Sequence, residues 1–144
     1  SEASISANGN FVAFSSIASN LDPTDTTPAG WDVLGHDINL STTAIVSSDG
    51  AGVQLDYARE PSINGNGRVI AFEAEYGDVF VKQINGPGFL QASVDSAGIV
   101  GNDGSFNPSL SLNGRVVSFH SVATNLDVLV PDTNGETDVF LHRN

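Results

Sequence analysis

The sequence predicts an all-β, β-propeller-like fold built from three four-stranded antiparallel blades. Two observations lead to this prediction. One phrase occurs three times, as ASISANGNFVAF at 3–14, PSINGNGRVIAF at 61–72 and PSLSLNGRVVSF at 108–119. A second phrase follows each copy and contains an Asp-Val pair that begins at Asp32, Asp78 or Asp138. Strand-like repeats of about 40 to 50 residues are typical of propeller blades.

Each repeat divides into four short strands. The first is Ser-Ile-Ser-like, and an Asn-Gly turn joins it to the second, because Asn-Gly supplies the positive φ angles that a tight hairpin needs. The second strand (FVAF, VIAF or VVSF) is almost unbroken in apolar residues, which fits burial on both faces. The third strand is Asp-Val-Phe-like, and the fourth is expected at 42–48 and 90–96. No stretch shows a helical period.

The repeats divide one domain, 1–144, at about 1–58, 59–106 and 107–144. They differ most in the connection between the second and third strands. Six residues separate Phe72 from Asp78 in the second repeat, against 18 in the first and 19 in the third. Variation confined to one connection indicates a surface loop on a shared core. The third repeat reaches Asn144 without a fourth strand.

The third repeat, PSLSLNGRVVSFHSVATNLDVLVPDTNGETDVFLHRN, resembles the TolB-type, WD-repeat-like propeller repeat. The shared pattern is a Pro-Ser-Ile-Ser strand, an Asp/Asn-Gly-Arg turn, a Val-Ala-Phe-Ser strand, a Ser-Asn-Leu loop, an Asp-x-Asn-Gly segment and an Asp-Val-Phe strand. The resemblance covers essentially the whole chain. It implies a propeller of six to eight blades, a binding role more often than catalysis, and a periplasmic, secreted or cell-surface location in a bacterium.

Three repeats are too few for a closed ring, because blades bury their apolar faces against their neighbours. An open stack leaves apolar faces and strand edges exposed at both ends. Three arrangements follow: a homodimer that closes a six-bladed ring, a half-ring or fragment of a longer propeller, or a compact, non-propeller packing of three small sheets. Ser1 is interpreted as a cut end.

The composition excludes several classes of function. The chain has 17 acidic and 5 basic residues and a net charge of −12, which repels nucleic acid and anionic membranes. It has no cysteine, so disulfides and thiolate chemistry are excluded. The sequence has no run of about 18 apolar residues, so no membrane span is predicted. An acidic surface favours solubility and also suits hard cations such as calcium.

The segment PDTNGETD at 131–138 is the sharpest local motif. Its oxygen-bearing side chains alternate along the chain: Asp132, Asn134, Glu136 and Asp138. Alternating oxygen ligands are typical of calcium loops, so calcium is the candidate cofactor. The match is partial, because Gly135 falls at position 4 instead of 6. The alternative is a turn in which Asp132 accepts backbone N–H groups and Asp138 begins a strand.

Three further side chains are candidate ligand-binding residues. Trp31 follows a Pro/Gly-rich loop and fits either a sugar or peptide platform or packing over that loop. Glu73 and His120 share a matched position directly after each repeated Phe, where the first repeat has Ser15. A polar position that varies in this way fits a binding mouth with a Glu73–His120 acid/base pair, or plain surface variation.

The sequence contains no nucleophile elbow, phosphate loop or dinucleotide fingerprint. We therefore expect a non-catalytic binding or scaffold module that recognises a protein or carbohydrate through the loops at 17–31 and 120–137. Two alternatives stay open. One is part of a propeller lyase or glycosidase that uses paired carboxylates in a central funnel. The other is a purely structural spacer.

Overall fold

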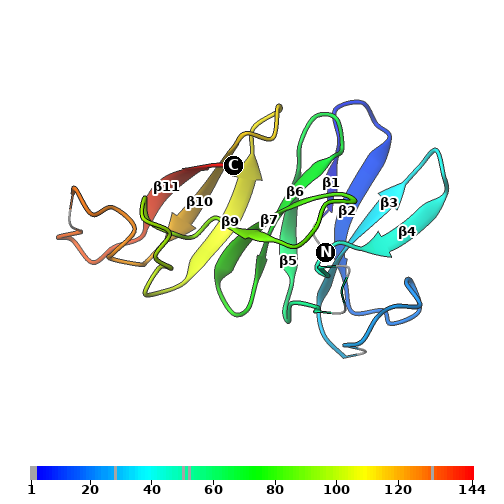
Figure 1. Ribbon diagram of the computed structural model, residues 1–144, viewed down its shortest axis with the longest axis horizontal. Coiled ribbons are helices and arrows are strands. Elements are labelled where there is room, and N and C mark those ends of the chain that lie inside the picture. The colour runs from blue at the N-terminus through cyan, green and yellow to red at the C-terminus, as the bar shows by residue number, and fades with distance from the viewer. Residues whose placement is uncertain (1–2, 28, 50, 52, 131) are drawn as a thin grey trace.

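The structure is a computed structural model that describes residues 3–27, 29–49, 51, 53–130 and 132–144. Within these residues the chain forms eleven β-strands and no helix, arranged as three antiparallel sheets that follow one another along the molecule (Figure 1). None of the described segments is a helix able to cross a membrane. Ser1, Pro28 and Pro131, which entered the sequence interpretation, lie outside the described residues.

Each sheet is built from consecutive strands, which confirms the predicted order within a repeat. The first sheet consists of β1 (Ala3–Ile5), β2 (Phe11–Ser16), β3 (Asp32–Asp37) and β4 (Thr42–Ile45). The second consists of β5 (Arg59–Ile63), β6 (Val69–Ala74), β7 (Asp78–Gln83) and β8 (Leu90–Gln91). The third consists of β9 (Ser105–Leu110), β10 (Val116–Ser121) and β11 (Asp138–Arg143). Within the described residues, the third sheet thus has three strands and β11 is its edge.

An Asn-Gly hairpin joins the first two strands of every sheet, as predicted. One glycine in each turn has a left-handed φ, of +70°, +74° and +71° respectively: Gly9, Gly67 and Gly114. The first residue of each turn stabilises the hairpin through its side-chain oxygen. This oxygen accepts the N–H of the first residue of the second strand. Ser111 Oγ, for example, accepts the Val116 N–H at 3.0 Å.

A bulge bends the first strand of the second and third sheets. Glu60 and Asn107 occupy matched positions directly before a proline, and both have left-handed backbone, with φ of 52° and 54°. The pairing register shifts beside each of them. Because the strand continues through the bulge, β9 begins at Ser105, slightly earlier than the expected repeat boundary at 107.

The fourth strands are shorter than the sequence predicted. β4 ends at Ile45 and β8 at Gln91, instead of continuing to 48 and 96. Val46 and Ser47 both donate their N–H to the Val33 carbonyl, at 2.8 and 3.2 Å, so the regular ladder stops there. The chain then turns towards the next sheet. The apolar and serine pattern correctly predicted a fourth strand, but the backbone hydrogen bonds end that strand before the pattern does.

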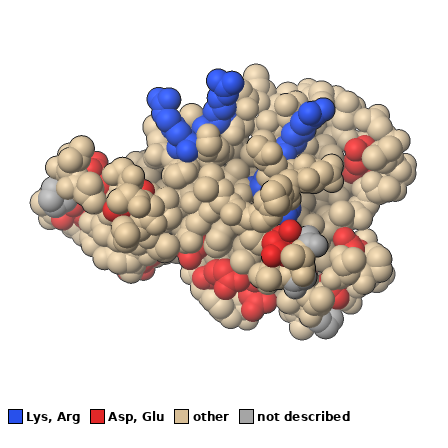
Figure 2. Space-filling model, viewed as in Figure 1, with Lys and Arg blue, Asp and Glu red and all other residues tan. Residues whose placement is uncertain are grey.

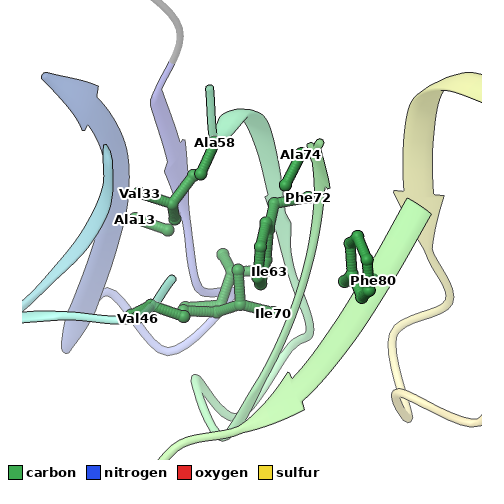
Figure 3. Close-up of a cluster of buried hydrophobic side chains, with 9 residues drawn as sticks. All are labelled: Ala13, Val33, Val46, Ala58, Ile63, Ile70, Phe72, Ala74 and Phe80. Carbon is green, nitrogen blue, oxygen red and sulfur yellow. The ribbon is translucent and has the colours of Figure 1, made fainter. Parts of the chain in front are cut away.

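A continuous core lies between the first and second sheets (Figure 3). It consists of Ala13, Val33, Val46, Ala58, Ile63, Ile70, Phe72, Ala74 and Phe80. Phe72 is fully buried, and its ring lies 6.2 Å from that of Phe80 and 6.1 Å from that of Phe89. Burial of one such ring stabilises the fold by about 1.5–3 kcal/mol. A second core, which includes Val79, Val117 and Phe119, joins the second sheet to the third.

A serine bridge repeats at each junction between sheets. Ser4 Oγ accepts the Ile63 N–H at 3.2 Å, and the matched Ser62 Oγ accepts the Leu110 N–H at 2.9 Å. The matched serine of the third sheet, Ser109, is exposed. The repeats therefore fix how each sheet stacks on the next, as well as the strands within it.

The outer face of the third sheet is open. Val139 and Leu141 on β11 are 68% and 73% exposed, whereas the matched Val79 and Val81 on β7 are 0% and 5% exposed. Val79 and Val81 are covered by the core of the third sheet. The expectation that an open stack exposes apolar side chains at its end is confirmed on this face.

Candidate functional site

The charges of the molecule separate towards the two ends of its sheets. We call the end with the Asn-Gly turns the hairpin end, and the end with connections 17–31, 75–77 and 122–137 the loop end. Four of the five basic side chains lie towards the hairpin end: Arg68, Lys82, Arg115 and Arg143. Acidic side chains at the loop end include Asp22, Asp25, Asp56, Glu75, Asp127 and Asp132. Figure 2 shows basic groups projecting from one edge, and most of the acidic groups in view lie away from that edge.

Two tyrosines, the only ones in the sequence, meet at the loop end of the second sheet. The ring centroids of Tyr57 and Tyr76 lie 4.3 Å apart with an interplanar angle of 42°. The two residues are nevertheless 42% and 72% exposed. An exposed aromatic pair among acidic side chains is a candidate binding platform.

Reciprocal hydrogen bonds hold the two tyrosine-bearing segments together. The Glu75 N–H donates to the Asp56 carbonyl at 2.8 Å, and the Asp56 N–H donates to Glu75 Oε1 at 2.9 Å. These bonds tie the connection after the first sheet to the tight turn between β6 and β7. The short turn of the second repeat is therefore the part that anchors the platform.

The backbone of this platform is strained. Tyr57, Glu75 and Tyr76 all have left-handed φ, of 55°, 52° and 65°, although none of them is glycine. Such a conformation costs about 1–2 kcal/mol per residue and persists where surrounding contacts impose it. Strained residues of this kind are concentrated at binding and catalytic sites. The strain thus adds a second reason to examine the tyrosine pair.

The electrostatics of the pair favour a cationic ligand. The hydrogen bond with Tyr57, followed by desolvation and the nearby negative charges of Asp56 and Glu75, raises the pKa of Tyr76 to about 12. The Tyr76 ring presents a negative π face beside two carboxylates, an arrangement that attracts an ammonium or guanidinium group.

The backbone of the predicted residue Trp31 is hydrogen-bonded to the segment that carries Tyr57. Its carbonyl accepts the N–H of Ala58 at 2.8 Å, and Ala58 directly follows Tyr57. Trp31 is half-buried and directly precedes β3. The sequence analysis singled out Trp31 but missed both tyrosines. A usable signal was present, since each tyrosine follows an acidic residue in a connection between strands.

The structure does not bring Glu73 and His120 together. Glu73 is buried on β6, and its Oε1 lies 3.6 Å from the Arg59 Nη2 of the paired strand. His120 is exposed on β10, opposite Val139. No hydrogen bond or ion pair joins the two side chains in the described part of the chain. The matched Ser15 hydroxyl is buried and has no hydrogen-bond partner among the described residues.

The hydrogen bonds of the 132–138 segment are those of a turn. Asp132 Oδ1 accepts the N–H groups of Asn134 and Gly135, at 2.9 and 3.1 Å. Asn134 Oδ1 accepts the Glu136 N–H at 2.9 Å. Among residues 3–27, 29–49, 51, 53–130 and 132–144, no group of three His, Cys, Asp or Glu side chains is placed to hold a metal ion. Calcium binding by this segment, including Asp138, stays a prediction.

The repeated aspartate at the start of the third strand bonds to a buried serine. Asp78 Oδ1 accepts the Ser93 hydroxyl at 2.9 Å, and Ser93 Oγ accepts the Val79 N–H at 3.3 Å. The first sheet repeats this arrangement with Asp32 and Ser47, at 3.2 Å. The Asp–Ser pair therefore holds the segment after the fourth strand against the third strand.

Comparisons with known proteins agree on the fold. No protein-family profile and no curated protein sequence matches the chain. The structure is similar to that of the tricorn protease, with a TM-score of 0.58 and 12% identity over 98% of this chain and 13% of that chain. It is similar to TolB from Acinetobacter baumannii, with a TM-score of 0.58 and 10% identity over 98% of this chain and 29% of that chain.

This chain has a β-propeller-like fold. An acylaminoacyl peptidase from Pyrococcus horikoshii is also similar, with a TM-score of 0.54 and 12% identity over 93% of this chain and 19% of that chain. The chain thus spans less than a third of the length of each of these propeller proteins. The three sheets are successive blades, which excludes the non-propeller packing considered above.

Proposed function

We propose that the chain is a non-catalytic propeller module that binds a basic segment of a protein partner at its loop end. The observation that carries this proposal is the exposed Tyr57–Tyr76 pair, held in a strained conformation between Asp56 and Glu75. A Lys or Arg side chain placed over a tyrosine ring gains a cation–π contact and a nearby carboxylate. The backbone of Trp31 is hydrogen-bonded to Ala58, the residue after Tyr57, so we propose Trp31 as a further part of the platform.

The charge distribution supports a basic partner. Many of the acidic side chains lie at the loop end, and the Lys and Arg side chains lie mostly at the opposite end. Such a separation orients an approaching cationic surface and raises its association rate at low salt. The longer loops of the first and third blades, 17–31 and 122–137, also carry acidic side chains, and we include them in the proposed binding surface.

A non-catalytic role is supported by the hydrogen bonds of the carboxylates. At the loop end they act as acceptors that shape the backbone: Asp22, Asp25, Asp95, Asp127 and Asp132 each accept a nearby N–H. Glu73 is engaged with Arg59. By resemblance to the TolB-type repeat, we propose that the module operates in a bacterial exported or cell-surface protein.

A carbohydrate is the second candidate ligand, because an exposed tyrosine pair also stacks well against a sugar ring. Salt distinguishes the two. Binding of a basic peptide weakens as ionic strength rises, whereas stacking of a neutral sugar on the same rings depends little on salt.

The experiment is a fluorescence anisotropy titration with a labelled peptide of alternating Lys and Gly, and with an alternating Glu and Gly peptide as control. We expect saturable binding of the Lys peptide alone. Tyr76→Ala should weaken it by about threefold to tenfold, the range that a cation–π contact supplies. Glu75→Gln should weaken it as well, since it removes one negative charge beside the ring.

Asp37→Asn is the matched control, because it removes one carboxylate charge at the hairpin end. It should leave the affinity within about twofold of the unmodified chain. Absence of saturable binding, or equal affinities for Tyr76→Ala and the unmodified chain, would overturn the proposal. Sugar binding that is lost in Tyr76→Ala and insensitive to salt would replace it with the carbohydrate alternative.

A further inference from the structure

The composition of the chain directs oxidation towards its two tyrosines. The sequence has no cysteine and no methionine, the side chains that most often react with oxidants. Its remaining side chains that lose a single electron readily are one tryptophan and two tyrosines. Trp31 is half-buried, whereas Tyr57 and Tyr76 are 42% and 72% exposed. An oxidant in solution therefore reaches the tyrosine pair most easily.

The two rings are placed to form a covalent bond with each other. Their centroids lie 4.3 Å apart. A hydrogen bond joins the two hydroxyl groups, so the rings meet along their hydroxyl-bearing sides. The ortho carbons flank the hydroxyl-bearing carbon of each ring and lie at this meeting edge. These are the carbons at which two tyrosyl radicals couple to give dityrosine.

The backbone fixes this arrangement before any oxidant arrives. The Glu75 N–H donates to the Asp56 carbonyl at 2.8 Å, and the Asp56 N–H donates to Glu75 Oε1 at 2.9 Å. Both tyrosines also have left-handed φ, of 55° and 65°. Reacting groups that are held in contact in this way behave as one molecule and react far faster than groups that meet by diffusion.

The neighbouring charges favour the loss of an electron from these rings. The negative charges of Asp56 and Glu75 lie close enough to Tyr76 to contribute to its raised pKa. Removal of an electron from a phenol leaves a positive charge until the hydroxyl proton departs. Nearby carboxylates stabilise that charge and accept the proton.

We infer that Tyr57 and Tyr76 form an oxidation site at which the two side chains couple to an intramolecular dityrosine. The oxidant is hydrogen peroxide, used by a haem peroxidase. Each phenol loses one electron and one proton, and a carbon–carbon bond forms between the two ortho carbons. The hydrogen on each coupled carbon then moves to the ring oxygen, which restores the aromatic rings. In sum, the pair loses two hydrogen atoms, and one hydrogen peroxide is reduced to two waters.

The cross-link would stabilise the second blade. Tyr57 lies just before β5 and Tyr76 in the turn between β6 and β7, so the new bond joins positions that are 19 residues apart. A cross-link of this kind restricts the unfolded chain, as a disulfide does, and the described sequence has no cysteine to form one. We expect it to raise the thermal midpoint by about 5–10 °C.

The experiment treats the full chain at micromolar concentration with a haem peroxidase and limiting hydrogen peroxide. Trypsin cuts after Arg59 and Arg68, so Tyr57 and Tyr76 fall in separate peptides, 1–59 and 69–82. We expect mass spectrometry to find these two peptides joined, with the loss of two hydrogen atoms. The product should show dityrosine fluorescence and keep the size of a single chain on a denaturing gel.

Two variants test the chemistry directly. Tyr57→Phe and Tyr76→Phe each keep the ring and remove one hydroxyl, and each should abolish the joined peptides. The unmodified chain unfolded in urea retains both tyrosines but separates them. Its yield should fall by about tenfold or more, because the contact between the rings is lost.

A further pair of variants tests the positioning of the rings. Glu75→Ala removes the acceptor of the Asp56 N–H and should lower the yield. Asp37→Ala is the matched control, since Asp37 Oδ1 also accepts backbone N–H groups, but at the hairpin end, and the yield should stay unchanged. Far-UV circular dichroism establishes that each variant is folded. The result is separate from that of the peptide titration, which contains no oxidant and tests the proposed function.

Four outcomes would overturn the inference. The first is an oxidised chain in which peptides 1–59 and 69–82 are not joined. The second is an equal yield from the folded and the unfolded chain, or cross-links between chains only. The third is oxidation of Trp31 while both tyrosines stay intact. The fourth is a cross-linked chain whose thermal midpoint is not raised.

Discussion

Replacement of Ser93 by alanine tests the repeated pair that holds the segment after each fourth strand. Ser93 is fully buried, donates to Asp78 Oδ1 at 2.9 Å and accepts the Val79 N–H at 3.3 Å. Ser93→Ala removes a hydrogen bond to a carboxylate and leaves a buried N–H without its partner. These two losses together lower the free energy of unfolding by roughly 2–4 kcal/mol.

The assay is urea unfolding, followed by the fluorescence of Trp31 and by far-UV circular dichroism. We expect a lower urea midpoint with an unchanged denaturant slope, since the surface exposed on unfolding stays the same. Ser96→Ala is the control, because Ser96 is exposed just beyond the buried pair, and its effect should stay within about 0.5 kcal/mol. Ser47→Ala should resemble Ser93→Ala, because the first blade repeats the same bonds.

A loss below about 1 kcal/mol for Ser93→Ala would refute this reasoning, because it would mean that water replaces the serine at no net cost. A loss within the expected range for both serines would establish the Asp–Ser pair as a repeated stabilising element of this propeller.

Four further predictions follow from individual contacts. Burial raises the pKa of the Asp32 carboxyl above 3.8. The stability that the protonated Asp32 contributes is therefore full below its unfolded pKa and is lost as pH rises through its folded pKa. In urea unfolding, the stability of Asp32→Asn should rise relative to that of the unmodified chain between about pH 3 and pH 7. Gly35→Ala should cost about 1–3 kcal/mol, because the added Cβ would lie 2.5 Å from the Phe11 ring, and an unchanged urea midpoint would show that the ring moves aside freely. Calcium at 132–138 predicts a higher thermal midpoint in millimolar calcium than in EGTA, with the difference lost in Asp132→Asn. A six-bladed homodimer predicts a mass of twice 14.9 kDa by light scattering, and a mass of 14.9 kDa would exclude it.

The repeats in the sequence revealed some residues of the candidate site and not others. Trp31 was selected because it is the one tryptophan and precedes Asp32 after a Pro/Gly-rich loop, and its role in binding stays a prediction. Tyr57 and Tyr76 were missed because they lie in connections between strands, and the sequences of these connections differ from repeat to repeat. Glu73 and His120 share a repeat position but belong to different blades, and a shared position does not make two side chains neighbours.

The sequence by itself determined the strands, their order and the Asn-Gly turns, because short-range φ preferences and apolar patterns act within a few residues. It also placed Asp32 and Asp78 at matched positions, where each accepts the hydroxyl of a buried serine. Only the tertiary structure decided where β4 and β8 stop, since Val46 and Ser47 share one carbonyl of Val33. It also brought Tyr57 and Tyr76 together across 19 residues of sequence, through hydrogen bonds between two turns that no local pattern specifies.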